Sequence, residues 1–388
     1  MKYNFDEIID RRDTNSLKYD FPELYGKPAN AIPLWIADMD FRIPPMIMAA
    51  VQKCADHGIY GYAETKEDYL DAVAGWFAKV HGYHVKTDWI VKAPGVVFAL
   101  GMLIQGLTAP GDAIVIQKPL YPPIEGTIVA NNRVAIDNPL VYSQGRYAVD
   151  LEDFERKIAE NNARMFVLCN PHNPVGRVWT REELYNMGRI CQKHDCLVVS
   201  DEIHCDIVFE GHKHLVFSTV CEEFADFSVI CTAPSKTFNL AGLQASNTFI
   251  SNEELRARFK RAILASGYHQ LGTMGIAACQ AAYEHCEDWR RELVQYLAQN
   301  ATFVYEYLAA EIPEIKAVPL EGSYLQWVDF NRLGLPHEQL IEKLNRAKVW
   351  PSNGVAFGAA GSGFFRFNLA CPRSVLETAM ERIAKEFR

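Results

Sequence analysis

Short apolar runs alternate with amphipathic segments along the middle of the chain, between residues 90 and 265. The runs are short enough to be strands, and apolar residues recur at helical spacing between them. Strands are predicted at 89–94, 113–116, 133–136, 164–169, 196–202, 228–231 and 246–250, and helices at 64–81, 95–104, 150–158 and 252–266. Thr180 and Glu183 form a capping box that opens one more helix. This alternation is typical of a parallel α/β sheet, whose chemistry lies at the carboxyl ends of the strands.

The two ends of the chain follow other patterns. Residues 1–48 are irregular and rich in proline, and residues 274–309 are helical for an unusual length, as two helices or one bent helix. Further strands at 324–329 and 364–368 and helices at 337–347 and 373–387 predict a smaller α+β unit. We therefore expect an N-terminal arm with part of the small domain (1–48), a large domain (49–285) and a small C-terminal domain (286–388).

Composition narrows the class of protein. The 388 residues carry a net charge of −9, which argues against a nucleic-acid partner. No apolar run approaches the roughly 20 residues of a membrane span, and the first residues lack the apolar segment of a signal peptide. The 10 cysteines include no Cys-x-x-Cys pair. We expect reduced, mostly buried thiols in a cytoplasmic protein.

Lys236 follows the predicted strand 228–231 and a Pro-Ser turn. A lysine at a strand end can be desolvated, which lowers the pKa of its amine and makes it more nucleophilic. An ordinary exposed loop lysine is the alternative. Asp201 ends another apolar strand, where a carboxylate either pairs with a buried cation or makes a structural hydrogen bond. The double Asn-Pro loop 170–176 and His204 also fall at strand ends or in the loops that follow them.

Gly95 lies between a predicted strand and a predicted helix, and the free N–H groups of a helix N-terminus bind anions. An ordinary buried helix explains the segment equally well, and neither nucleotide fingerprint is present. Together, Lys236, Asp201 and the Asn-Pro loop suggest a bound pyridine aldehyde. Pyridoxal phosphate needs an amine, an anion beside its ring nitrogen and N–H donors for its phosphate. Asp38 and Asp40 could hold a metal ion, but hydrogen-bonded carboxylates explain this pair better, and we expect no metal.

Six segments carry a resemblance to a known family. The chain resembles the fold-type I pyridoxal-phosphate enzymes of the aspartate aminotransferase superfamily, and most of all the cystathionine β-lyase and cysteine-S-conjugate lyase branch of MalY/PatB type. The segments are TrpIleAlaAspMetAspPhe (35–41), HisGlyIleTyrGlyTyr (57–62), AsnProHisAsnProValGly (170–176), SerAspGluIleHis (200–204), ProSerLysThrPheAsn (234–239) and PheArgPheAsnLeuAlaCysProArg (365–373). The resemblance implies an α/β, aspartate aminotransferase-like fold, with a mostly parallel seven-stranded sheet and a smaller α+β domain.

The resemblance also implies roles for residues around the pyridine ring. Lys236 would be the Schiff-base lysine and the proton carrier, and Asp201 would pair with the pyridinium nitrogen. Asn173 and His204 would contact the ring 3′-oxygen; a histidine at position 204 is typical of the lyase branch. Tyr121 would stack on the ring, although an aromatic plug before the Pro-Pro turn is the alternative.

A second group would hold the phosphate and the substrate. The N–H groups of Val96 and Val97 and the Ser235 hydroxyl would bind the phosphate. Tyr62 would reach the phosphate of the neighbouring subunit, which implies a homodimer. Arg366 would bind the substrate α-carboxylate, with a surface strand arginine as the alternative.

The chain departs from the aminotransferase pattern near the phosphate. Gln244 stands where many aminotransferases carry an arginine, and Ala233 stands where a serine is common. The phosphate would be held with less charge, with Thr232 as a substitute donor.

The activity implied by the resemblance is α,β-elimination from a sulfur-containing L-amino acid such as cystathionine, giving a thiol, pyruvate and ammonia. A class I/II aminotransferase is the second hypothesis. A regulatory binding role with residual lyase activity is the third.

Overall fold

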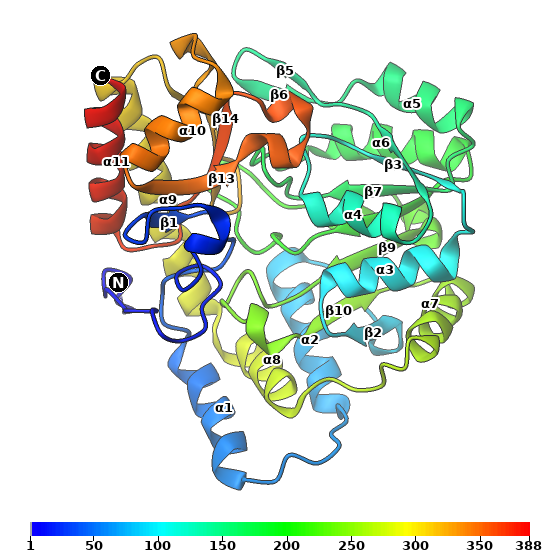
Figure 1. Ribbon diagram of the computed structural model, residues 1–388. Coiled ribbons are helices and arrows are strands. Elements are labelled where there is room, and N and C mark those ends of the chain that lie inside the picture. The colour runs from blue at the N-terminus through cyan, green and yellow to red at the C-terminus, as the bar shows by residue number, and fades with distance from the viewer. Residues whose placement is uncertain (1) are drawn as a thin grey trace.

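A seven-stranded sheet forms the centre of the computed structural model, which describes residues 2–388 (Figure 1). In spatial order its strands are β2 (Ile90–Ala93), β10 (Ser246–Phe249), β9 (Ser228–Thr232), β8 (Leu197–Asp201), β7 (Met165–Cys169), β3 (Ala113–Ile116) and β4 (Val134–Asp137). Only β10 runs against its neighbours, pairing antiparallel with both β2 and β9. The predicted mostly parallel sheet of seven strands is therefore confirmed.

Both faces of this sheet are covered by helices, which explains why its central strands are apolar throughout. Ile114 and Ile116 pack with α3, α4 and α7, whereas Ala113 and Val115 belong to the core on the opposite face, with α2, α5, α6 and α8. The helices around the sheet are α1 (Pro45–His57), α2 (Glu67–His81), α3 (Val96–Leu107), α4 (Pro122–Ala130), α5 (Leu151–Glu160), α6 (Arg181–Lys193), α7 (Glu253–Ala265) and α8 (Thr273–His285). The capping box at the start of α6 is formed as predicted.

A second sheet of five strands lies beside the first (Figure 1). Its order is β1 (Ile32–Leu34), β13 (Val349–Asn353), β14 (Phe364–Asn368), β12 (Leu325–Asp329) and β11 (Lys316–Ala317). Residues of α9 (Glu287–Glu311), α10 (His337–Arg346) and α11 (Arg373–Phe387) form its core. The long helical stretch is two helices, α8 and α9, which meet at Cys286. The domain boundaries themselves remain a prediction.

Several short elements were not predicted. β1 has three residues and joins the second sheet in parallel with β13. The hairpin of β5 (Val141–Ser143) and β6 (Arg146–Ala148) is mostly exposed, so it lacks the apolar pattern that identifies a strand.

The acids of the N-terminal segment are ion-paired. Arg11 pairs with Asp38 and with Asp40, each at 2.7 Å, and the buried ammonium of Lys18 lies 2.8 Å from Asp40. Basic side chains therefore satisfy these carboxylates, as expected for hydrogen-bonded acids. Within residues 2–388, no helix is both long and apolar enough to cross a membrane.

Candidate active site

A cavity of about 450 Å³ opens where β7 and β8 end and α3 begins. It brings together eight of the ten predicted site residues, although they are far apart in the chain. These eight are Val96, Val97, Tyr121, Asn173, Asp201, His204, Ser235 and Lys236. Arg366 borders the cavity through Asn173, while Tyr62 lies elsewhere.

Lys236 is half-buried in this cavity. Its Nζ donates a hydrogen bond to the Ala37 carbonyl at 2.7 Å. Burial, with help from the Arg366 charge, lowers the pKa of the Lys236 amine to about 8, against the opposing pull of Asp38 and Asp201. The side chain is thus a partly desolvated amine with a larger neutral fraction than an ordinary lysine has, and not an exposed loop lysine.

Asp201 is the last residue of β8 and lies half-buried at the cavity wall. Its Oδ1 accepts a hydrogen bond from the Ile203 N–H at 3.2 Å. Burial raises the pKa of the Asp201 carboxyl to about 6, although the Ile203 N–H and the Lys236 charge oppose this shift. A cation placed beside this carboxylate would be stabilised by it, because an opposite charge at close range favours the ionised form.

The N-terminus of α3 forms another wall. Gly95 precedes the helix, and its carbonyl accepts the first helical hydrogen bond, which comes from the Ala99 N–H. The N–H groups of Val96 and Val97 lie before this point, so the helix provides no acceptor for them. No side chain of residues 2–388 caps this helix end. With the Ser235 hydroxyl beside it, the wall has the character of an anion site.

Arg366 is 5% exposed in the centre of β14. Its guanidinium donates to Asn173 Oδ1 (2.9 Å), to the Trp35 carbonyl (2.7 Å) and to Ser352 Oγ (3.1 Å). The Phe357 ring lies 4.8 Å from its central carbon. Burial lowers the pKa of Arg366 to about 10, so it keeps its charge at neutral pH. It is therefore not a surface arginine.

His204 is buried, and its ring meets the Tyr324 ring edge-on at 6.0 Å. Burial, followed by the charges of Lys236 and Arg366, lowers the pKa of His204 to about 3 and keeps the imidazole neutral. Its Nδ1 finds no hydrogen-bond partner among the described residues. His204 also lines the cavity, so its imidazole can contact a bound group.

Tyr62 lies away from these groups. It is fully exposed in the loop between α1 and α2 and lines a separate cavity of about 460 Å³, together with Gly242 and Leu243. Within one chain, Tyr62 therefore contributes nothing to the cavity that holds Lys236.

Backbone carbonyls of the N-terminal segment are the parts of the site that sequence reasoning missed. Ala37 accepts from Lys236 and from the Tyr324 hydroxyl (3.0 Å), and Trp35 accepts from Arg366. The resemblance marked this segment as significant, but nothing in its side chains indicates the role of its carbonyls.

The expectation for Thr232 is wrong. Its hydroxyl donates to the Asn247 carbonyl at 2.8 Å inside the sheet, so it is not free to bind a phosphate. Gln244, in contrast, lines the cavity.

The donor set fits pyridoxal phosphate. An amine with a lowered pKa, a carboxylate, an imidazole, an aromatic ring and a helix N-terminus line one cavity. These are the groups that an aldehyde, a pyridine nitrogen, a ring face and a phosphate require.

Comparisons with known proteins give the same picture over the whole chain. The model of the class I and II aminotransferases matches residues 29–383. The chain is 42% identical over 382 residues to the cystathionine β-lyase PatB of Bacillus subtilis (strain 168), with 98% of each chain covered. Cystalysin of Treponema denticola, solved with pyridoxal 5′-phosphate, gives a TM-score of 0.96 at 36% identity, covering 100% of this chain and 99% of the other. A pyridoxal-phosphate-bound C–S lyase of Staphylococcus hominis gives 0.93 at 31% identity, covering 100% and 98%.

Proposed function

Because the chain belongs to the class I and II aminotransferase family, we propose that it is a pyridoxal-phosphate-dependent carbon–sulfur lyase. The family also confirms the expected aspartate aminotransferase-like fold. The observation that carries the proposal is the full-length likeness to a cystathionine β-lyase. The reaction is α,β-elimination, which converts a cystathionine-type L-amino acid and water into a thiol, pyruvate and ammonia.

When bound, pyridoxal phosphate supplies an aldehyde that condenses with amines and a pyridine ring that accepts electrons from the substrate Cα. Lys236 would supply the resident amine, and the Asp201 carboxylate would hold a proton on the ring nitrogen. Asn173 and His204 would contact the ring oxygen, and Tyr121 would lie against the ring face. Support for these roles comes from the single cavity that the five side chains share.

The phosphate is bound by the N–H groups of Val96 and Val97 and by the Ser235 hydroxyl. Gln244 brings no positive charge to this wall, so the helix N-terminus contributes a larger share of the attraction.

Arg366 and Lys236 act on different parts of the substrate. Arg366 binds the α-carboxylate as a planar fork and so fixes the orientation of the substrate Cα. The neutral Lys236 amine takes the Cα proton at Nζ, and the Cβ–S bond then breaks with the electron pair leaving on sulfur. The lowered pKa of Lys236 suits it to accept this proton near neutral pH.

Incubation with L-cystathionine and no keto acid tests the activity directly. We expect the yellow, cofactor-loaded protein to release pyruvate and ammonia in equal amounts. It should do so without a keto acid, because elimination needs no second substrate. A coupled lactate dehydrogenase assay measures the pyruvate. Turnover that begins only after a keto acid is added would contradict elimination and favour the aminotransferase hypothesis.

The active unit is proposed to be a homodimer in which Tyr62 completes the phosphate site of the neighbouring subunit. Tyr62 and the adjacent Tyr60 and Ile59 are 101%, 62% and 70% exposed. Such a group of large exposed side chains favours a protein partner.

A mixture of two inactive variants tests this arrangement. Refolding Lys236→Ala chains together with Tyr62→Ala chains should restore activity above that of either parent, because one site of each hybrid dimer then carries both native residues. In the matched control, Lys236→Ala chains are mixed with Tyr60→Ala chains, which carry a substitution in the same exposed loop. No gain over the Tyr62→Ala parent would contradict a role for Tyr62 in the phosphate site of the neighbouring subunit.

A cytoplasmic location is also proposed. All ten cysteines are free and eight of them are buried, which suits a reducing compartment. Recovery of the protein in the secreted fraction of its host would contradict this location.

A further inference from the structure

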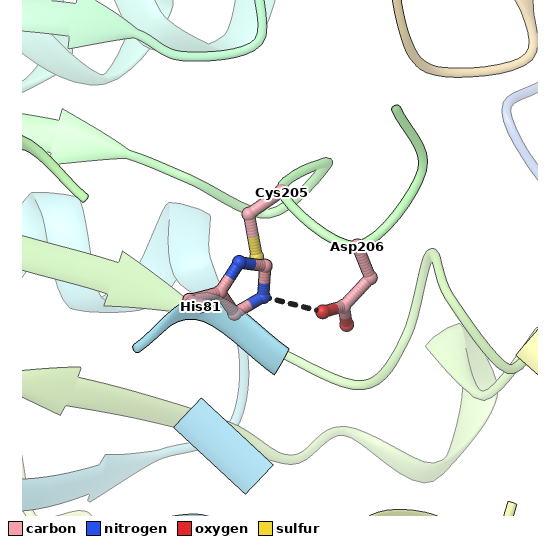
Figure 2. Close-up of side chains that lie close together, drawn as sticks. All are labelled: His81, Cys205 and Asp206. Atoms are coloured by element: carbon pink, nitrogen blue, oxygen red, sulfur yellow. Dashed lines mark hydrogen bonds and ion pairs between the residues drawn. The ribbon is translucent and has the colours of Figure 1, made fainter. Parts of the chain in front are cut away.

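A buried polar cluster lies behind the active site, centred on Asp206. Figure 2 shows the Asp206 carboxylate joined to the imidazole of His81, with Cys205 beside the ring. The distance from Asp206 Oδ1 to His81 Nε2 is 2.8 Å, and the Trp76 indole donates to the same oxygen at 3.0 Å. The other oxygen, Oδ2, accepts the Thr237 hydroxyl at 2.7 Å.

This cluster is a hydrogen-bonded anchor and not a metal centre. The ligand atoms of His81, Cys205 and Asp206 lie within 4.8 Å of one another, which suits a metal ion. However, both Asp206 oxygens already accept hydrogen bonds, and His81 Nε2 faces one of them at hydrogen-bond distance. Burial, and then the neighbouring Asp206 and Glu202 charges, raise the pKa of the Cys205 thiol, so it remains protonated.

Thr237 connects the cluster to the active site. It directly follows Lys236 in the chain and is completely buried, whereas Lys236 enters the cavity. The bond from Thr237 to Asp206 therefore fixes the backbone from which the lysine extends. Arg290 supports Asp206 from the other side, since its Nη1 donates to the Asp206 carbonyl at 3.0 Å.

A second arm runs from the same cluster towards Asp201. The His81 ring meets the His214 ring edge-on at 5.4 Å, and His214 Nε2 lies 2.7 Å from Glu202 Oε2. Glu202 follows Asp201 in the chain, and its Oε1 accepts from Ser200 and from the Phe217 N–H. The residues next to Lys236 and next to Asp201 are thus both held in one buried layer.

We propose that Asp206, held by His81, is a positioning residue that fixes Lys236 through the Thr237 hydroxyl. The inference rests on the proposed function, in which Lys236 must reach the cofactor and then the substrate Cα. A lysine has four rotatable side-chain bonds, so its reach is reproducible only if its backbone is fixed. Three donors on one carboxylate provide that fixed point.

Thr237→Val tests the proposal, because it keeps the shape of the side chain and removes the hydroxyl. We expect kcat for elimination to fall about 10-fold to 100-fold, as for a small misplacement of a reacting group, with KM nearly unchanged. The visible absorbance band of the lysine-bound cofactor should also titrate at a shifted pH, which requires no turnover. Thr237→Ser keeps the hydroxyl and should restore both values.

The controls separate this proposal from its rivals. Cys205→Ala should leave kcat, the absorbance titration and the zinc content unchanged. If Cys205→Ala and His81→Gln instead lost activity equally and also lost bound zinc, the cluster would be a metal site and not an anchor. If Thr237→Val kept the kcat and the absorbance titration of the native protein, the proposal would also be wrong. If Thr237→Val does not fold, Asp206→Asn carries the same comparison. A native protein that shows no visible band would indicate instead that the proposed function is at fault.

Discussion

Lys236→Ala is expected to lose the visible absorbance band of the bound cofactor and to lower the rate of elimination by about 10⁴-fold or more. The substitution removes the amine that is proposed to hold the cofactor and to take the Cα proton. The measurement is an absorbance spectrum of protein dialysed after loading with pyridoxal phosphate, followed by the pyruvate assay.

Lys260→Ala is the control for this result, because Lys260 is exposed on α7 and does not line the cavity. It should retain the band and the full rate. If Lys236→Ala kept the yellow band after dialysis, another amine would hold the cofactor and the assignment of Lys236 would be wrong.

Arg366→Ala is expected to raise KM for the amino acid roughly 100-fold, since a charge-assisted fork to a carboxylate contributes roughly 2–4 kcal/mol. The side chain is buried and its guanidinium already has the planar geometry that a carboxylate needs. Initial rates over a wide range of cystathionine concentrations separate KM from kcat.

Arg366→Lys provides the matched comparison, since it keeps the charge and loses the fork. Its KM should fall between those of the native protein and Arg366→Ala. An unchanged KM with a reduced kcat in Arg366→Ala would assign carboxylate binding to another residue. Thermal unfolding of each variant is needed as well, because Asn173, Ser352 and the Trp35 carbonyl lose a donor.

The strand ends could be predicted from the sequence because a strong physical pattern locates them. The apolar strands β3, β7 and β8 stop at or just before a polar residue, and parallel strands bring their carboxyl ends to one edge. For this reason the sequence alone predicts that Asp201 and the Asn173 loop lie together, with Lys236 in the loop after a third strand. The antiparallel direction of β10 could not be predicted, because its residues are as buried as those of the adjacent strand β9.

Other features leave no signature in a single sequence. The carbonyls of Trp35 and Ala37 are backbone atoms, so their contacts do not depend on the side chains at those positions. The Asp206 anchor joins residues from three distant segments, and each looks ordinary by itself. The error over Thr232 has a similar origin, since its position near Lys236 in sequence does not reveal that its hydroxyl points into the sheet.

Because β1 pairs with β13, a newly made chain can complete the second sheet only late in its synthesis. Ile32 is synthesised early, but its partner Val349 emerges only after every strand of the seven-stranded sheet has been made. Until then the segment that carries Trp35 and Ala37 has no sheet to join. The residues proposed to bind the cofactor are therefore encoded ahead of Arg366, which is proposed to bind the amino acid. A chain interrupted before β14 carries Lys236 and Asp201 but lacks Arg366.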